Sequence, residues 1–262
     1  MLEEKRLRQE LQNVSLWIKE YVEKAGAEGV VVGNSGGKDS AVVIALAQKA
    51  LGKDKVITIA MPCSSMHEDI QDARLVANTF EVPVLCIDLT EQYVQLESKL
   101  NQELQKHKIA NQITKEAGIN IKPRLRMTTL YAIAQTMNYL VIGTGNLCER
   151  MVGYTTKWGD SASDFNPIAN FTVEEVLKLG EYLGVPDKIL HKAPNDGLGG
   201  LTDEEKMGIT YKQIAEYIET GKTEKGATEI IKRKYQASCH KRKEIPTYPV
   251  QRENFLEQEE KW

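Results

Sequence analysis

A glycine-rich turn between two apolar segments carries the strongest chemical signal in this chain. The turn follows the apolar run 29–33 and leads into the apolar stretch 40–51, an order typical of a strand, a turn and a helix. Adjacent glycines let backbone N–H groups approach phosphate oxygens, and a helix N-terminus adds about half a unit of positive charge. The residues that we expect to bind phosphate are Gly33, Asn34, Ser35, Gly36, Gly37, Lys38, Asp39 and Ser40.

An aspartate inside this phosphate-binding turn requires a cation nearby. The turn is not a Walker A loop, which would have glycine in place of Val32 and serine or threonine in place of Asp39. A carboxylate is repelled by phosphate unless a cation lies between them, so Asp39 predicts Mg²⁺. The alternative, in which Lys38 and Asp39 are only solvated at a helix start, fits less well with the flanking Ser35 and Ser40.

A second glycine-rich turn follows another apolar run, 139–143, and it also carries a carboxylate, Glu149. If the two runs are neighbouring strands, Asp39 and Glu149 lie close enough to share one metal ion. From these residues alone, an exposed helical position for Glu149 is equally compatible with the sequence.

The elements that must position these turns alternate along the chain. Four short apolar runs lack the polar alternation of half-buried strands and are typical of strands buried on both faces. The runs are 29–33, 56–61, 83–89 and 139–143, and the helical stretches are 40–51, 68–80, 91–106 and 124–137. This alternation predicts an α/β fold with a parallel doubly wound sheet flanked by helices.

We interpret residues 1–262 as a single domain, because no internal repeat or flexible linker interrupts the pattern. Apolar residues at three- and four-residue intervals predict an N-terminal docking helix at about 4–25. Capping boxes at Thr172–Glu175 and Thr202–Glu205 predict helices after the fourth strand. We expect the segment at about 190–262 to supply a C-terminal lid and a basic tail.

Composition argues against several classes of protein. The net charge of −3 gives no general electrostatic case for binding nucleic acid. No stretch approaches the roughly 18 apolar residues of a membrane span, and the charged N-terminus lacks the apolar core of a signal peptide. We therefore expect a cytoplasmic protein with no nucleic-acid or membrane partner. The four cysteines form no Cys-x-x-Cys pair, which indicates reduced structural thiols.

The Ser-Gly-Gly-x-Asp-Ser turn after a strand resembles the pyrophosphate loop of the ATP pyrophosphatases, the PP-loop superfamily. This superfamily includes the NAD, GMP and asparagine synthetases. The resemblance implies an adenine nucleotide alpha-hydrolase-like fold, ATP as co-substrate and cleavage of ATP between its α- and β-phosphates. The loop alone does not indicate which acceptor is used.

Later motifs resemble the ammonia-dependent NAD synthetases. The segments Gly143-Thr-Gly-Asn146, Gly153-Tyr-Thr-Thr-Lys157-Trp-Gly-Asp160 and Asp164 look like the family signature around Glu149. The Arg124-Leu-Arg126-Met127 and His240-Lys241-Arg242 segments resemble further parts of the family, over roughly residues 10 to 246. The resemblance implies ATP-dependent amidation of deamido-NAD to NAD with ammonia, through an adenylated carboxylate with release of AMP and pyrophosphate.

The resemblance also implies roles for individual residues. Asp39 and Glu149 would bind Mg²⁺, and Thr144 would contact ATP. The catalytic candidates are Asp39, Lys38 and Asp160, the last as a carboxylate near ammonia. Cationic side chains suit a dinucleotide with two phosphates. The residues implied to contact deamido-NAD are Arg124, Lys157, Asp164, His240 and Lys241.

Three positions depart from the family pattern. Val173 and Asn195 occupy positions implied to contact ATP, and the family commonly has Lys or Arg at the first of them. Lys206 stands where we expect an acidic residue. Loss of a phosphate-facing cation weakens charge stabilisation in the transition state unless another cation replaces it, and Lys38 is the candidate.

The source of nitrogen follows from length. Relatives that use glutamine append an amidase domain, and 262 residues leave no room for one beside this domain, so we expect free ammonia as the donor.

The resemblance also implies a homodimer that binds deamido-NAD at the subunit interface. The alternatives are a PP-loop amide synthetase acting on another carboxylate, a tRNA-thiolating enzyme, and a catalytically weakened ATP-binding protein of the same fold. A thiolating enzyme needs a sulfur-carrying cysteine in the site and an RNA-binding extension, and the sequence indicates neither.

Overall fold

The computed structural model describes residues 2–64, 67–192 and 202–248. Within this part of the chain, four parallel strands form one sheet in the order β3-β2-β1-β4. The strands are β1 (Gly29–Gly33), β2 (Val56–Ala60), β3 (Val84–Cys86) and β4 (Tyr139–Ile142). The predicted parallel sheet is confirmed. Because β1 and β4 are paired neighbours, the two glycine-rich turns leave the same edge of the sheet side by side.

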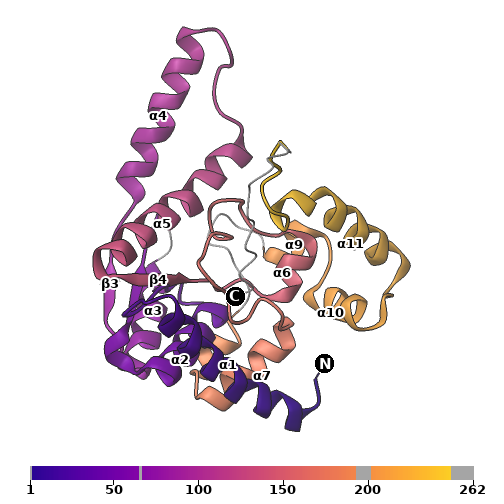
Figure 1. Cartoon of the computed structure of the whole chain (residues 1–262). Coiled ribbons are helices and arrows are strands. Elements are labelled where there is room, and N and C mark those ends of the chain that lie inside the picture. The colour runs from indigo at the N-terminus through magenta and orange to yellow at the C-terminus, as the bar shows by residue number, and fades with distance from the viewer. Residues whose placement is uncertain (1, 65–66, 193–201, 249–262) are drawn as a thin grey trace, which may run out of the picture.

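Helices cover both faces of the sheet, as a doubly wound fold requires (Figure 1). The helices and short 3₁₀ helices are α1 (Glu4–Lys24), α2 (Lys38–Leu51), η1 (Lys53–Lys55), α3 (His67–Thr79), α4 (Thr90–Lys106), α5 (Lys115–Met137), α6 (Leu147–Val152), α7 (Val173–Leu183), α8 (Asp187–Leu190), α9 (Asp203–Met207), α10 (Tyr211–Thr220), α11 (Lys225–Ala237) and η2 (Cys239–Lys241). Val30 and Val32 pack into a buried cluster with α1, α2 and α7. Val31 faces the opposite way and packs with α5. None of the helices in the described part of the chain combines the length and apolar character that a membrane span requires.

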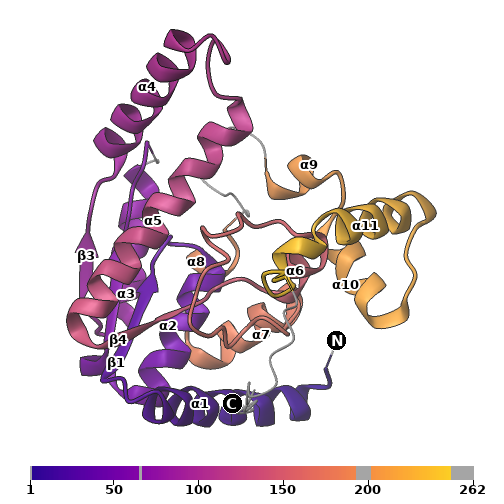
Figure 2. The same cartoon turned by 45° about the horizontal axis from the view of Figure 1, so that its top comes forward.

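The predicted N-terminal helix is present and lies along α2 and α7. Its buried residues, among them Leu7, Leu11 and Ile18, recur on one face and join the cluster beneath β1. Figure 2 shows this helix running across the base of the molecule.

Two predicted elements differ from the structure. The run 83–89 was expected to be buried on both faces, but β3 is a short edge strand whose Leu85 is 41% exposed. The helix after it, α4, has no buried residue and projects away from the sheet instead of covering this strand (Figure 1). The helix expected at 124–137 begins earlier, at Lys115, where the Thr114 side chain caps it, and it continues through Pro123.

The C-terminal helices form a second apolar cluster beside α6. Residues of α9, α10 and α11 pack there against Cys148 and Val152 of α6 and against Val173 of α7. Helices α9, α10 and α11 therefore attach to α6, the helix that follows the second glycine-rich turn.

Candidate active site

The phosphate loop connects β1 to α2, and two serines shape it. Ser35 Oγ accepts a hydrogen bond from the Gly37 N–H at 3.2 Å and lies 3.1 Å from Ser40 Oγ. Ser40 in turn donates to the Gly37 carbonyl oxygen at 2.9 Å. Gly37 immediately precedes α2, so the loop ends at the N-terminus of a 14-residue helix. The partial positive charge of this terminus favours an anion at the loop.

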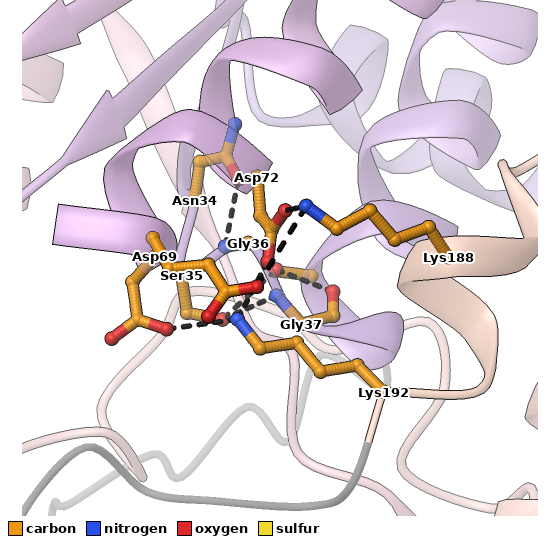
Figure 3. Close-up of polar contacts among 10 residues, drawn as sticks. Asn34, Ser35, Gly36, Gly37, Asp69, Asp72, Lys188 and Lys192 are labelled. Atoms are coloured by element: carbon orange, nitrogen blue, oxygen red, sulfur yellow. Dashed lines mark hydrogen bonds and ion pairs between the residues drawn. The ribbon is translucent and has the colours of Figure 1, made fainter. Parts of the chain in front are cut away.

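The loop rests directly on α3, as Figure 3 shows. The buried Asn34 side chain donates from Nδ2 to the Ala73 carbonyl oxygen at 2.8 Å and accepts from the Gly36 N–H at 3.2 Å. Gly36 has φ +73°, and a Cβ there would lie 2.7 Å from the Asp69 carbonyl oxygen and 2.8 Å from Asp72 Cβ. Only glycine combines this backbone angle with so close an approach.

The second glycine-rich turn contacts the first through Asn146. This buried residue caps α6: its side chain accepts from the Glu149 N–H at 3.1 Å, and the Glu149 carboxylate accepts from the Asn146 N–H at 2.9 Å. The Asn146 amide also donates to Asp39 Oδ1 at 3.3 Å. Sequence reasoning did not select Asn146 as a site residue. The Asn-x-x-Glu spacing of a capping box was the available signal.

The two carboxylates and Lys38 interact electrostatically. Burial, reinforced by the charge of Asp39, raises the pKa of Glu149 to about 8. Burial lowers the pKa of Lys38, but the charges of Asp39 and Glu149 outweigh it and raise that pKa above its ordinary value. Lys38 Nζ lies 3.0 Å from Asp39 Oδ2 and 5.5 Å from the centre of the Tyr211 ring. A further cation would stabilise this site, because its two carboxylates repel each other.

A cavity opens at the carboxyl ends of the strands, next to the phosphate loop. Gly33, Asn34 and Ser35 line one side of it, together with Thr144 of the second turn. The apolar part of the lining comes mainly from β2, β4 and α5 and includes Ile59, Met61, Met127, Leu130 and Ile142. Crevices at this edge of open α/β sheets are where ligands bind.

The α5 wall of this cavity is a set of residues that sequence reasoning missed as a group. Pro123, Arg126, Met127 and Leu130 all line it and recur at three- and four-residue spacing, so they occupy one face of the helix. Arg126 also donates from Nε to the Met61 carbonyl oxygen at 3.0 Å, which ties α5 to the end of β2. The helical spacing was the signal, but the expected helix began at residue 124.

Asp160 lies at the rim of the same cavity. Its Oδ1 accepts a hydrogen bond from the Thr156 N–H at 2.7 Å. Part of the residue is exposed, yet burial of the carboxyl is the main cause that raises the pKa of Asp160. Asp160 is thus a carboxyl group held in a defined orientation in the lining of this cavity.

Two predicted substrate contacts, Arg124 and Lys241, fasten the loop that carries Asp160 and a third predicted contact, Lys157. Arg124 donates from Nε and Nη2 to the Lys157 backbone carbonyl oxygen at 3.3 and 3.2 Å, which ties α5 to this loop. The Lys241 ammonium donates to the carbonyl oxygens of Gly153 and Thr155. None of the three lines the cavity.

Asp164, a fourth predicted contact, lies beside β4. Its carboxylate accepts from the Val141 N–H at 2.7 Å and from the Tyr131 hydroxyl at 3.2 Å. These bonds attach the chain after Asp160 to the open edge of the sheet, next to the bridge between Ile142 and Phe165.

Three further positions named from the sequence, His240, Val173 and Lys206, are absent from the cavity lining. His240 is exposed in η2, and Val173 is buried in the apolar cluster next to α6. Lys206 is half-buried on α9. Asn195 lies outside the described residues.

These features define a class of protein. The inner strand β1 of a parallel α/β sheet ends in a Ser-Gly-Gly-x-Asp-Ser loop, and this loop lies beside a second glycine-rich turn and an open cavity. This arrangement is the nucleotide-binding fold of the PP-loop proteins. Within that class the family is specific: a family model described as NAD synthase matches residues 10–253, and the chain belongs to this family.

Individual relatives agree with this membership. The chain is 46% identical over 235 residues to the NH(3)-dependent NAD(+) synthetase of Carboxydothermus hydrogenoformans, covering 89% of this chain and 94% of that protein. Among solved structures, an NMN synthetase from Francisella tularensis has a TM-score of 0.84 at 35% identity, with 93% of this chain and 99% of that chain covered. An NH3-dependent NAD synthetase from Campylobacter jejuni, in complex with the nitrate ion, has a TM-score of 0.75 at 25% identity, with the same coverage.

Proposed function

We propose that this protein is a ligase that amidates the nicotinate carboxyl group of deamido-NAD with ammonia, at the cost of cleaving ATP to AMP and pyrophosphate. The observation that carries the proposal is the contact of Asp39 in the Ser35–Ser40 loop with Asn146, the capping partner of Glu149, beside an open cavity. The chain also shares 46% identity with an NH(3)-dependent NAD(+) synthetase. Free ammonia as the nitrogen donor agrees with the name of that relative.

The ATP site combines the phosphate loop with the cavity. The loop backbone and the N-terminus of α2 suit the phosphates, while the apolar wall formed by Met61, Met127 and Leu130 suits the flat purine. Thr144 stands at the junction between them as a polar contact.

Mg²⁺ fits the carboxylates present. Asp39 and Glu149 offer oxygen ligands, and their mutual repulsion favours a divalent cation between them. No group of three or more potential ligands occurs among the residues that the structure describes. This agrees with Mg²⁺, which commonly uses one or two carboxylates together with waters and substrate phosphates. When bound, the ion would neutralise charge on the phosphates.

The reaction requires two displacements. An oxygen of the nicotinate carboxylate attacks the α-phosphorus of ATP, and the bond from that phosphorus to the bridging oxygen of pyrophosphate breaks. Ammonia then attacks the acyl carbon, its surplus proton is released, and AMP leaves with the electron pair of the acyl–oxygen bond. The loop holds the departing pyrophosphate through its N–H groups and Lys38 adds positive charge, while the rest of the acceleration comes from positioning.

Asp160 is the candidate group beside ammonia. Its position in the cavity lining and its raised pKa suit a carboxyl that binds ammonia or accepts a proton from the attacking nitrogen. Lys38 is the candidate replacement for the cation missing at Val173, because it is paired with Asp39 inside the loop whereas Val173 is buried among apolar side chains.

Arg124, Lys157, Asp164, His240 and Lys241 stay proposed contacts of deamido-NAD. Arg124 and Lys157 have the best support, because Arg124 of α5 donates to the Lys157 carbonyl oxygen on the loop that carries Asp160. For Lys241 and Asp164, the hydrogen bonds that they already make support a role in holding the walls of the substrate site.

A second candidate substrate is nicotinate mononucleotide, the acceptor that lacks the adenylate half. The NMN synthetase from Francisella tularensis favours it, since its TM-score of 0.84 is higher than the 0.75 of the NAD synthetase from Campylobacter jejuni. The two candidates share the same chemistry and the same phosphate loop, so they differ only in what the acceptor site must recognise.

One assay compares them. The protein is incubated with MgATP, ammonium chloride labelled with ¹⁵N, and either deamido-NAD or nicotinate mononucleotide, and the products are identified by mass spectrometry. We expect labelled NAD with equal amounts of AMP and pyrophosphate. Labelled NMN at the higher kcat/KM would establish the mononucleotide instead. ADP as product, or AMP without either amide, would contradict the proposal, and an Asp39→Ala variant with full activity would contradict the metal site.

We also propose that the protein is a homodimer that acts in the cytoplasm. Support for the dimer comes from α4, which projects from the sheet (Figure 2). Its Leu96 and Leu100 are exposed and are four residues apart, on one helical face. The cytoplasmic location rests on the sequence expectation alone.

A further inference from the structure

A fully buried carboxylate, Asp72, lies directly behind the phosphate loop. Lys188 Nζ and Lys192 Nζ each lie 2.7 Å from one of its oxygens, and Lys192 also lies 2.9 Å from Asp69 Oδ1 (Figure 3). We call Asp69, Asp72, Lys188 and Lys192 the loop clamp. The lysines come from α8 and the residues just after it, more than 100 residues from α3 along the chain.

Burial of Asp72 is costly unless its charge is compensated, because a lone carboxylate in the protein interior loses its hydration. The two ammonium groups supply that compensation. Their hydrogen bonds outweigh the effect of burial and lower the pKa of Asp72. Lys192 is the more buried partner at 24% exposure, against 56% for Lys188. We therefore expect Lys192 to contribute more, since solvent screens exposed ion pairs.

The part of α3 that carries Asp69 and Asp72 is also in direct contact with the phosphate loop. Asn34 binds the carbonyl oxygen of Ala73, the residue after Asp72, and Gly36 faces the Asp69 carbonyl and Asp72 Cβ at distances that leave no room for a side chain. A shift of α3 at Asp72 would therefore move the loop backbone with it.

The segment that carries the two lysines packs against α2, the helix that follows the phosphate loop. Ile189 and Leu190, between Lys188 and Lys192, are buried in the main core. A Cβ on Gly180 of α7 would lie 2.4 Å from Leu190 and 3.1 Å from Val42 of α2, so α8, α7 and α2 are in close contact there. The loop is thus enclosed in a ring that runs from α2 through α8 and the clamp to α3.

We propose that the loop clamp positions the phosphate loop for ATP and for the departing pyrophosphate, with Asp72 and Lys192 as positioning residues that do not touch substrate. The proposal rests on the proposed function only in that the loop binds these phosphates. Asp69 lines the cavity as well, so Lys192 also holds part of the nucleotide-site wall in place.

The test uses Asp72→Asn, Lys192→Met, Lys188→Met and the conservative Lys192→Arg in the full chain. Lys53→Met is the matched control, because the Lys53–Glu81 ion pair is also 2.7 Å long but is exposed. Lys53 follows the C-terminal end of α2, whereas the phosphate loop precedes its N-terminal end. Circular dichroism first establishes a temperature at which every variant is folded. Calorimetry then measures the Kd of MgATP and of magnesium pyrophosphate, and steady-state kinetics measures KM for each substrate.

We expect Asp72→Asn and Lys192→Met to weaken binding of both phosphate ligands about tenfold, because a small displacement of a binding loop has large effects. The KM for deamido-NAD should change little. Lys188→Met should weaken binding about twofold, as for a screened pair. Lys192→Arg should keep a near-normal affinity for both phosphate ligands, and Lys53→Met should bind them as tightly as the wild type does.

Unchanged MgATP and pyrophosphate affinity in folded Asp72→Asn and Lys192→Met would overturn the proposal. So would an equal loss of affinity for ATP and for deamido-NAD, which indicates general destabilisation. A wild type that binds MgATP but makes neither amide, with binding weakened in the variants, would overturn the proposed function and leave the clamp supported. A wild type that binds neither phosphate ligand would overturn both.

Discussion

Gly36 occupies the point where the phosphate loop touches α3, and its φ of +73° is one that other residues adopt at a cost of about 1–2 kcal/mol. An added Cβ would also meet the Asp69 carbonyl oxygen at 2.7 Å. Gly26 offers a matched control, because it has φ +65° and nothing within 4 Å of an added Cβ.

We therefore expect Gly36→Ala to lower the free energy of unfolding by about 3 kcal/mol and Gly26→Ala by about 1 kcal/mol. Only Gly36→Ala should also weaken MgATP binding, because its clash displaces the loop. Urea denaturation and calorimetry measure the two effects. Equal losses of stability in the two variants would show that the contact with α3 is not as tight as the geometry indicates.

Glu149 makes stability depend on pH in the metal-free protein. Its pKa is raised from 4.5 to about 8, so between these values the folded protein keeps a proton that the unfolded chain has released. The group's contribution to stability is therefore fully present below pH 4.5 and is lost as the pH rises toward 8. Glutamine removes this dependence while keeping an oxygen that accepts from the Asn146 N–H.

We expect the stability advantage of Glu149→Gln over the wild type, measured by urea denaturation with EDTA, to grow from pH 5 to about 8 and then level off. Added Mg²⁺ should make the wild type more stable than Glu149→Gln, because only the wild type offers both carboxylates. A difference that stays constant across this range would contradict the raised pKa.

At the scale of elements, four capping boxes begin helices in the described part of the chain, and among them only the one at Asn146 also contacts the phosphate loop. Thr210 caps α10 with the same reciprocal hydrogen bonds, and none of its hydrogen bonds involves the site. Comparing substitutions at Asn146 and Thr210 therefore separates the stabilising role of a helix cap from the role of Asn146 in positioning Asp39.

Asn146→Ala and Thr210→Ala should each lower the free energy of unfolding by about 1 kcal/mol, the usual value of an N-cap. Asn146→Ala should in addition lower kcat by at least about tenfold, because Asp39 and Glu149 lose the residue that joins them. Denaturation curves and the amidation assay measure both. Equal kcat values for the two variants would show that Asn146 acts only as a cap.

At the scale of the whole molecule, α4 and the exposed edge strand β3 lie on the side of the sheet away from the C-terminal helices (Figure 1). Leu96 and Leu100 of α4 are each 38% exposed and are four residues apart on one face. Leu16 on α1 is a matched control, as a leucine 58% exposed on another helix.

We expect Leu96→Glu with Leu100→Glu to convert a dimer to a monomer at micromolar concentration, because buried charge destabilises an apolar interface. Leu16→Glu should leave the mass unchanged. Light scattering coupled to gel filtration measures the mass, and circular dichroism verifies that α4 stays helical. A wild-type monomer, or a dimer that survives both substitutions, would contradict the proposed interface.

Much of the fold and part of the site were predictable because they depend on residues near one another in the chain. The strand 29–33, the loop 33–40 and the capping boxes at Thr172 and Thr202 follow from local spacing and backbone preference. Whether β1 and β4 are neighbours was left open by the two glycine-rich turns, and the structure pairs them. Nothing local indicated that β3 would be exposed, because exposure depends on whether α4 folds back over it.

The sequence by itself determined where the chain turns, which turn suits phosphate, and that a carboxylate follows each glycine-rich turn. Tertiary structure alone decided which distant side chains meet: Asn146 with Asp39, and Lys192 with a buried Asp72 that is 120 residues away. The physical reason is that an ion pair or a cavity wall depends on how whole elements pack. Such packing is set by the sum of many apolar contacts across the molecule, which no short segment encodes.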